Sequence, residues 1–238
     1  MKRFYDRVDT EHRDGGFAVL LDGRTIKTPG GQPLSVPAAD LGHAIAAEWA
    51  AQTETVRPQT MPFTRFANTV IDGIAPDPSG VAEAVLGVFA NDLLCYRAEE
   101  PEGLVARQEK AWAPVLAWAG REWGIDLTVT TGVMPCVQPA TTRLAAEAWV
   151  GRLDPFSLGA VHMAATLTAS GVLALALAEG HLAAATVWSL SRIDEDWQIA
   201  RWGEDEEAAE RAALRRRELA NAANILQWMR TDPDHSRE

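Results

Sequence analysis

The sequence predicts an α+β protein of two domains, in which a small, mainly-β N-terminal domain precedes a larger all-α domain. Short apolar runs between glycine-rich turns fill residues 1–37. From Ala38 onward the apolar residues recur at helical spacing instead. The charge is also uneven, because residues 1–75 carry 8 basic and 9 acidic side chains and the remainder carries 14 and 24. We therefore divide the chain into residues 1–75, with one or two helices beside the strands, and residues 76–238.

Turn signals separate the strands that we expect near the N-terminus. Gly15-Gly16 precedes the apolar run FAVLLDG, and Asp22-Gly23 is a strong signal for a two-residue hairpin. A further glycine pair separates RTIKTP from PLSVP. This pattern predicts three or four short strands in a small antiparallel sheet or partial barrel.

Helical periodicity and helix-breaking residues define the later elements. In LGHAIAAEWAAQ, residues Leu41, Ile45 and Trp49 lie four apart on one face, after a candidate cap at Asp40. The proline-bounded segment RPQTMPFTRFANT should be extended at first and helical from about Thr64. PDPSG then marks a break at 76–80. Further helices are expected at Val81–Asp92, Pro101–Gly124, Thr141–Arg152, Asp154–Ala178, His181–Arg201 and Glu204–Arg230.

Three apolar segments allow more than one interpretation. LLCYR at 93–97 and DLTVTTGV at 126–133 could each be a strand that returns to the N-terminal sheet. Residues 156–178 are 23 positions without Lys, Arg, Asp or Glu, which is long enough for a bilayer at about 1.5 Å per residue. However, this segment contains a histidine, hydroxyl groups and two glycines, and no basic cluster flanks it. A helix at the centre of a helical domain is therefore favoured over a membrane span.

Composition and charge exclude several classes of function. With 47% apolar and 23% charged residues, the chain resembles an ordinary globular protein. The net charge of -11 argues against nonspecific nucleic-acid binding and against an anionic membrane surface, since both depend on Lys and Arg. Cys95 and Cys136 are too few for a disulfide framework or a zinc site and fit a reducing compartment. The charged N-terminus lacks the apolar core of a signal peptide, so we expect a complete cytoplasmic chain.

The most unusual segment is IDEDWQIARWGEDEE at 193–207, with seven carboxylates and two tryptophans. No histidine or cysteine lies within ten residues of it, so it completes no known catalytic set. Glu204–Glu207 follow Gly203 and are expected in the first turn of a new helix, where the helix dipole favours negative charge. Asp194–Asp196 are expected late in their helix, where the dipole disfavours it. Such acids either pair with basic groups elsewhere or contact a partner protein, for which the neighbouring aromatic rings are well suited.

Other candidate sites have plainer explanations. LDGRTIKTPGG lacks the spacing of a phosphate loop, and the acidic cluster lacks that of an EF-hand. His162 and His181 are expected to be core or cap groups. Trp49 is expected in a segment packed onto the sheet, whereas Phe63 and Phe66 are candidates for a partly exposed apolar groove. No Ser–His–acid or Cys–His constellation is identifiable, so an enzyme is unsupported.

Four motifs that stand in order along the chain carry a resemblance to a known family. They are LDGRTIKTPGGQPLSVP, AIAAEWAAQTETVRPQTMPFTRFANTVID, NDLLCYRAEEPEGLVARQEKAWAPVLAW and SRIDEDWQIARWGEDEEA. Their combination covers roughly residues 4–230. It resembles the assembly factors that chaperone the alpha subunit of the F-one sector of ATP synthase, in mitochondria and alphaproteobacteria.

The resemblance implies a fold, a function and a site. It implies a small mainly-β domain and a larger helical one, in a protein that binds the unassembled alpha subunit without catalysis. Such a protein shields the surface that later faces the beta subunit and is displaced as the hexamer assembles. By position, Glu195 corresponds to the family's key acidic residue and Trp49 to its tryptophan motif. The rest of the C-terminal motif consists of Asp194, Asp196, Trp197, Gln198 and Trp202, with an inexact match at the two aspartates.

The sequence therefore predicts an assembly chaperone that needs no cofactor or metal, binds no nucleic acid and does not insert into a membrane. Without its client it should be mostly monomeric, in the bacterial cytoplasm or, for eukaryotic relatives, the mitochondrial matrix. Two alternatives stay open, a carboxylate-dependent metal enzyme and a self-associating helical scaffold built on the central apolar helix. Calorimetry with magnesium, manganese and calcium tests the first alternative, because a chaperone should take up no stoichiometric metal. Light scattering over a range of concentrations tests the second, because a chaperone should be mostly monomeric without its client.

Overall fold

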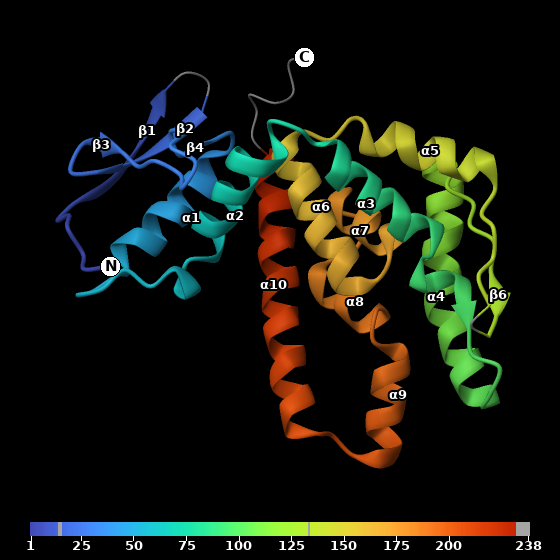
Figure 1. The fold of residues 1–238 in the computed structure, drawn as a ribbon. Coiled ribbons are helices and arrows are strands. Elements are labelled where there is room, and N and C mark those ends of the chain that lie inside the picture. The colour runs from blue at the N-terminus through green and yellow to red at the C-terminus, as the bar shows by residue number, and fades with distance from the viewer. Residues whose placement is uncertain (14–15, 133, 232–238) are drawn as a thin grey trace. The chain divides into compact units, whose positions relative to one another are not determined.

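The computed structural model describes residues 1–13, 16–132 and 134–231, and it has the α+β class that the sequence predicts (Figure 1). Two compact units are present. The first comprises Met1–Pro78, Pro155–Gly159 and Asn224–Glu238, and the second comprises Ser79–Asp154 and Ala160–Ala223. The units thus add two later segments to the N-terminal part, and the domain division after residue 75 stays a prediction.

A four-stranded antiparallel sheet forms part of the first unit. The apolar strand β2 is its centre, because it pairs with each of the other three strands. Asp22 and Gly23 connect β2 to β3 with φ angles of 48° and 79°, so the predicted hairpin is confirmed. The predicted glycine turn before β2 lies partly outside the described residues. The strands are β1 (Val8–Arg13), β2 (Gly16–Leu21), β3 (Arg24–Thr25) and β4 (Ser35–Val36).

Helices complete the first unit, and a carboxylate from one of them caps the next. Glu48 of α1 accepts hydrogen bonds from the backbone N–H groups of Phe63, at 2.7 Å, and Thr64, at 2.8 Å. These groups lie in the first turn of α2 and have no partner within the helix, so Glu48 supplies their acceptor. The helix begins at Pro62 rather than at about Thr64. Burial raises the pKa of the Glu48 carboxyl above its ordinary value. The elements are α1 (Ala39–Ala50), the 3₁₀ turn η1 (Pro58–Thr60), α2 (Pro62–Thr69) and the π-helical turn η2 (Val70–Ile74).

The second unit is built around α7, in which all eight residues are buried. It packs against α3, α4 and α8, so the sequence is correct that an apolar helix lies at the centre of a helical domain. Within the described residues, no helix is both long enough and apolar enough to cross a membrane. Two helices, α6 and α10, contribute residues to both units. The helices are α3 (Ser79–Ala90), α4 (Glu102–Trp123), α5 (Ala140–Val150), α6 (Pro155–Thr168), α7 (Gly171–Ala178), α8 (Ala184–Leu190), α9 (Ile193–Trp202) and α10 (Glu206–Thr231).

The prediction of one continuous helix over 154–178 is wrong, because the chain breaks between α6 and α7. Ala169 has a φ of 52°, in the left-handed region, and Ser170 caps α7 by accepting a hydrogen bond from the Leu173 N–H at 3.0 Å. The Ser170 hydroxyl in turn donates to the buried Asp92 carboxylate at 3.0 Å. A polar group distant in sequence therefore stabilises the break.

The prediction of one helix over 181–201 is also wrong. Helix α8 ends at Leu190, Arg192 has non-helical backbone angles (φ -122°, ψ 18°), and α9 begins at Ile193. The Ser191 hydroxyl donates to the Trp188 carbonyl at 2.9 Å. As a consequence, Asp194–Asp196 lie in the first turn of α9, where the dipole favours them, and not late in a helix as expected.

A second, two-stranded sheet accounts for the two ambiguous apolar patches. The 3₁₀ turn η3 (Leu93–Cys95) leads into β5 (Tyr96–Arg97), which pairs in parallel with β6 (Thr130–Thr131). The two patches therefore pair with each other, and the expectation that either returns to the N-terminal sheet is wrong. The last residue of the second patch, at position 133, lies outside the described residues.

Candidate functional site

The acidic motif occupies α9 and the start of α10, which follow each other at the end of the second unit (Figure 1). One face of α9 packs on α4. The Asp194 carboxylate accepts a hydrogen bond from Gln108 Nε2 at 2.6 Å. The Trp197 ring covers Gly103, where an added Cβ would lie only 2.8 Å from a ring atom. Asp194 and Trp197 thus attach α9 to the rest of its unit.

Gln108 makes this attachment specific. Its side chain is buried, and its Oε1 accepts a hydrogen bond from the Ala98 N–H at 2.8 Å while its Nε2 donates to Asp194. A buried side-chain amide needs a donor for its oxygen and an acceptor for its nitrogen, and Asp194 supplies the acceptor. Asp194 therefore has a structural partner inside the fold.

Two arginines contact further side chains of the motif, one at a carboxylate and one at an indole ring. Arg192 lies 3.6 Å from the Asp196 carboxylate and 5.1 Å from the centre of the Trp188 ring. Arg201 stands over the Trp197 ring at 4.5 Å. The Asp196 carboxylate is therefore also partly paired, with the arginine at the N-cap position of α9.

The opposite face of α9 points to solvent. Glu195, Gln198 and Trp202 are exposed, and together with Ile199 they follow the spacing of one helix face. Trp202 is 84% exposed, an unusual state for so large an apolar ring. Within the described residues, Glu195 forms no ion pair. The free carboxylate and the free indole of the motif thus share this outer face.

A cleft of about 300 Å³ borders this face at the turn into α10. Glu195, Ile199 and Trp202 line it from α9, and Ala208 and Ala209 line it from α10. Asp205 belongs to its rim and caps α10 by accepting from the Ala208 N–H at 2.8 Å. Carboxylates beside apolar walls suit a cationic side chain with an apolar stem, such as that of Arg or Lys.

Three comparisons with known proteins agree on a family. The family model described as ATP12 chaperone protein matches residues 2–120. Protein atp12, mitochondrial, of Schizosaccharomyces pombe is 26% identical over 221 residues, with 88% of this chain and 76% of that protein covered. The crystal structure of Atp12 from Paracoccus denitrificans is 42% identical and has a TM-score of 0.91, with 95% of this chain and 97% of that chain covered. A mutant of the Paracoccus protein gives a TM-score of 0.92.

The chain belongs to the ATP12 chaperone family. It is therefore one of the chaperones of ATP synthase assembly, and the family is a class of assembly factors rather than of enzymes. Within the described part of the chain, no group of three or more His, Cys, Asp or Glu side chains is placed to hold a metal ion. The carboxylate-dependent metal enzyme has no candidate site among these residues.

Three other residues that the resemblance and the sequence singled out belong to the first unit of this ATP12-family protein. Trp49 is 8% exposed, and its carbonyl accepts a hydrogen bond from the Tyr5 hydroxyl at 2.7 Å. Phe66 is likewise buried, against Phe156. Phe63 is half-buried beside Trp228, with 5.2 Å between the ring centres. The rings of Trp49 and Phe66 are thus core groups, and only Phe63 keeps part of its surface exposed.

The structure adds residues to the motif that sequence reasoning had not selected. Ile199 and the alanine pair Ala208 and Ala209 supply the apolar walls of the cleft. Ile199 follows Glu195 by four positions, so helical spacing alone could have indicated it. No comparable signal indicates the alanines, because they reach the cleft only through the turn at Gly203 between α9 and α10.

Gly103 provides a test of how α9 is attached. We expect Gly103→Ala to lower the free energy of unfolding by about 1 kcal/mol, because the new methyl group displaces the Trp197 ring. Gly87→Ala is the matched control, since its Cβ would meet no atom within 4 Å. It should raise the free energy of unfolding by about 0.5–1 kcal/mol through helix propensity. Urea unfolding measures both, and equal stabilisation by both substitutions would contradict the packing of Trp197 on α4.

Proposed function

We propose that this protein binds the unassembled alpha subunit of ATP synthase, masks the surface that later faces the beta subunit, and is displaced as the hexamer assembles. The outer face of α9, with Glu195 and Trp202 exposed beside the cleft, is the observation that supports this proposal most directly. An exposed tryptophan ring is costly for an isolated protein and is enriched in protein interfaces, and the carboxylate beside it adds a charge that can orient a partner.

The arrangement of α9 explains how the site is held while it stays accessible. The face with Asp194 and Trp197 is attached to α4, so the opposite face is presented on a positioned helix rather than on a loop. A preformed binding face loses little conformational entropy on binding. The acidic residues around it would steer a basic patch of the client and orient it.

Release needs no nucleotide and no catalysis in this scheme. A chaperone that covers an assembly surface with an interface of moderate size can be displaced by the proper partner subunit through mass action. We accordingly propose a non-enzymatic protein that is monomeric before it binds its client. We place it in the bacterial cytoplasm, for which the mitochondrial matrix is the equivalent in eukaryotic relatives.

The direct test is binding to purified ATP synthase subunits. The protein should bind isolated alpha subunit and not isolated beta subunit, and addition of beta subunit should release it. Glu195→Lys should keep the fold, because the side chain is exposed, and should weaken binding at least tenfold by placing a cation against the client's basic patch. Calorimetry and circular dichroism measure the two effects.

Glu122→Lys is the control, because it makes the same charge change on α4 at an exposed residue whose neighbour is Arg121. It should leave binding within about twofold, since exposed ion pairs contribute little. If Glu195→Lys unfolds the protein, Glu195 has a structural role and this site assignment fails. If alpha and beta subunits bind equally well, the proposed client is wrong.

A further inference from the structure

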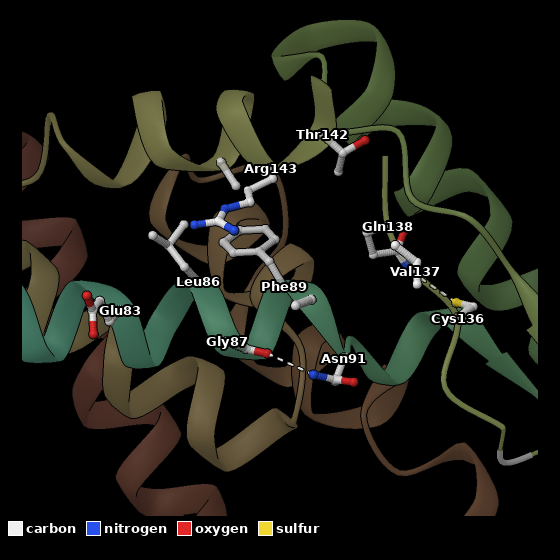
Figure 2. Close-up of a pocket in the computed structure, with 12 residues that line it drawn as sticks. Glu83, Leu86, Gly87, Phe89, Asn91, Cys136, Val137, Gln138, Thr142 and Arg143 are labelled. Atoms are coloured by element: carbon white, nitrogen blue, oxygen red, sulfur yellow. Dashed lines mark hydrogen bonds between the residues drawn. The ribbon is translucent and has the colours of Figure 1, made fainter. Parts of the chain in front are cut away.

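Two cysteines that the proposed function does not use lie against one side-chain amide. Gln138 Nε2 donates to Cys136 Sγ at 3.2 Å and to Cys95 Sγ at 3.6 Å. The distance between the two sulfur atoms therefore cannot exceed the sum of these two distances. Both cysteines are free, and Figure 2 shows the bond from Gln138 to Cys136 at one end of a cavity.

The cavity supplies a route for small molecules to one of the two sulfurs. It has a volume of about 530 Å³, and Cys136, Gln138 and Val137 form one wall while Leu86 and Arg143 contribute from α3 and α5 (Figure 2). Cys136 is partly exposed, whereas Cys95 is fully buried behind it. A small oxidant can thus reach Cys136 first.

One side chain holds the segment that carries Cys136 in place. Gln138 Oε1 accepts from the Thr128 N–H at 2.8 Å, and Cys136 Sγ donates to the Thr128 carbonyl at 3.4 Å. The described residues between β6 and α5 form no helix or strand, and the Val137 side chain is almost fully exposed. Few buried contacts therefore oppose a shift of this segment by the few ångströms that closing the two sulfurs to bonding distance requires.

We propose that Cys95 and Cys136 are a peroxide-sensitive pair that closes to an intramolecular disulfide. The Cys136 thiolate attacks one oxygen of hydrogen peroxide, the O–O bond breaks, and a sulfenic acid and hydroxide form. The Cys95 sulfur then attacks the sulfenic sulfur, an S–S bond forms and water leaves. In total, two thiols and one peroxide give one disulfide and two waters.

The environment of the two sulfurs sets the order of these steps. Burial raises the pKa of the Cys95 thiol to about 12, and the nearby Asp92 and Cys136 add to this effect. Cys95 is therefore a protonated thiol that does not react with peroxide first, although the hydrogen bond from Gln138 acts in the opposite direction and lowers its pKa. It becomes the resolving group when the shift of the Cys136 segment brings the sulfenic sulfur into contact with it. The disulfide would then fix the wall of the cavity in a shifted position.

Intact mass spectrometry of the folded protein after treatment with hydrogen peroxide tests this proposal. We expect the wild-type protein to lose about two mass units, with both thiols consumed and one peptide pair linking Cys95 to Cys136. Cys136→Ser should keep its single thiol under the same treatment, because Cys95 is buried. Cys95→Ala should accumulate a sulfenic acid at Cys136 that dimedone traps.

Three results would overturn the proposal. The first is a stepwise gain of oxygen at Cys136 in the wild-type protein while Cys95 stays a thiol. The second is a covalent dimer as the main product. The third is survival of both thiols at a peroxide concentration that oxidises the thiols of an unfolded control. The wild-type measurement does not depend on whether either variant folds. Circular dichroism shows whether each variant is folded, and only the results of folded variants are compared with the wild-type protein.

Discussion

Replacing Asp92 by alanine is expected to lower the free energy of unfolding by about 3–5 kcal/mol. Asp92 is completely buried and accepts hydrogen bonds from the N–H groups of Leu94 and Val172, both at 2.9 Å, and from the Ser170 hydroxyl at 3.0 Å. Alanine would leave these three donors unpaired in the core, at the break between α6 and α7. Urea unfolding measures the loss.

Two further substitutions show whether the hydrogen bonds cause this effect. Asp92→Asn keeps the shape and one acceptor oxygen, but its amide nitrogen would face the Leu94 N–H, so we expect a smaller loss of about 1–2 kcal/mol. Glu83→Ala removes an exposed carboxylate from the same unit and should change stability by no more than about 0.5 kcal/mol. Equal effects of Asp92→Ala and Glu83→Ala would contradict this role.

The pH dependence of the unfolding free energy provides an independent test of the role of Asp92. Burial raises the pKa of the Asp92 carboxyl to about 6 in the folded protein, against about 4 in the unfolded chain. Between these values the folded state binds more protons, so its stability should fall by about 3 kcal/mol as the pH rises from about 3 to about 7. Asp92→Asn should lack this fall. Identical pH profiles of the two proteins would show that Asp92 does not titrate in this range.

Removing the exposed indole by Trp202→Ala should weaken client binding by about 2–4 kcal/mol and leave the fold unchanged. Trp202 is 84% exposed, so its truncation removes few contacts within the protein. If the ring is the anchor of the interface, however, it becomes fully buried on binding, and most of its apolar surface contributes there. Calorimetric titration with alpha subunit measures the binding change, and thermal unfolding measures the fold.

Leu144→Ala is the control for nonspecific adhesion, because Leu144 is another large apolar side chain of the same unit and is 63% exposed. It should leave binding unchanged within about 0.5 kcal/mol. Combining Trp202→Ala with Glu195→Lys should cost less than the sum of the two single effects, since both residues line one cleft. Equal losses for Trp202→Ala and Leu144→Ala would contradict a specific site on α9.

Many features of this protein follow from local sequence. The Asp22-Gly23 turn predicts its hairpin because the backbone there needs two positive φ angles that these residues tolerate. Helical spacing of apolar residues predicts where helices occur but not the breaks within 154–178 and 181–201, and the motifs along the chain indicate the family. The first turn of α10 with its acidic residues also follows from local rules, since Gly203 ends one helix and the dipole favours Glu206 and Glu207 in the next.

Only the tertiary structure decides how the acidic motif is divided between its two faces. Gln108 donates a hydrogen bond to Asp194, which lies 86 residues later in the sequence. Asp92 accepts a hydrogen bond from Ser170, 78 residues later, and so stabilises the break before α7. No local pattern contains these partners. Helix propensity and dipole rules act over about four residues, whereas a buried polar group must be satisfied by whichever segment the fold brings beside it. For this reason the sequence alone indicates an acidic binding motif, and the packing of α9 on α4 determines that Glu195 and Trp202 are the members left free.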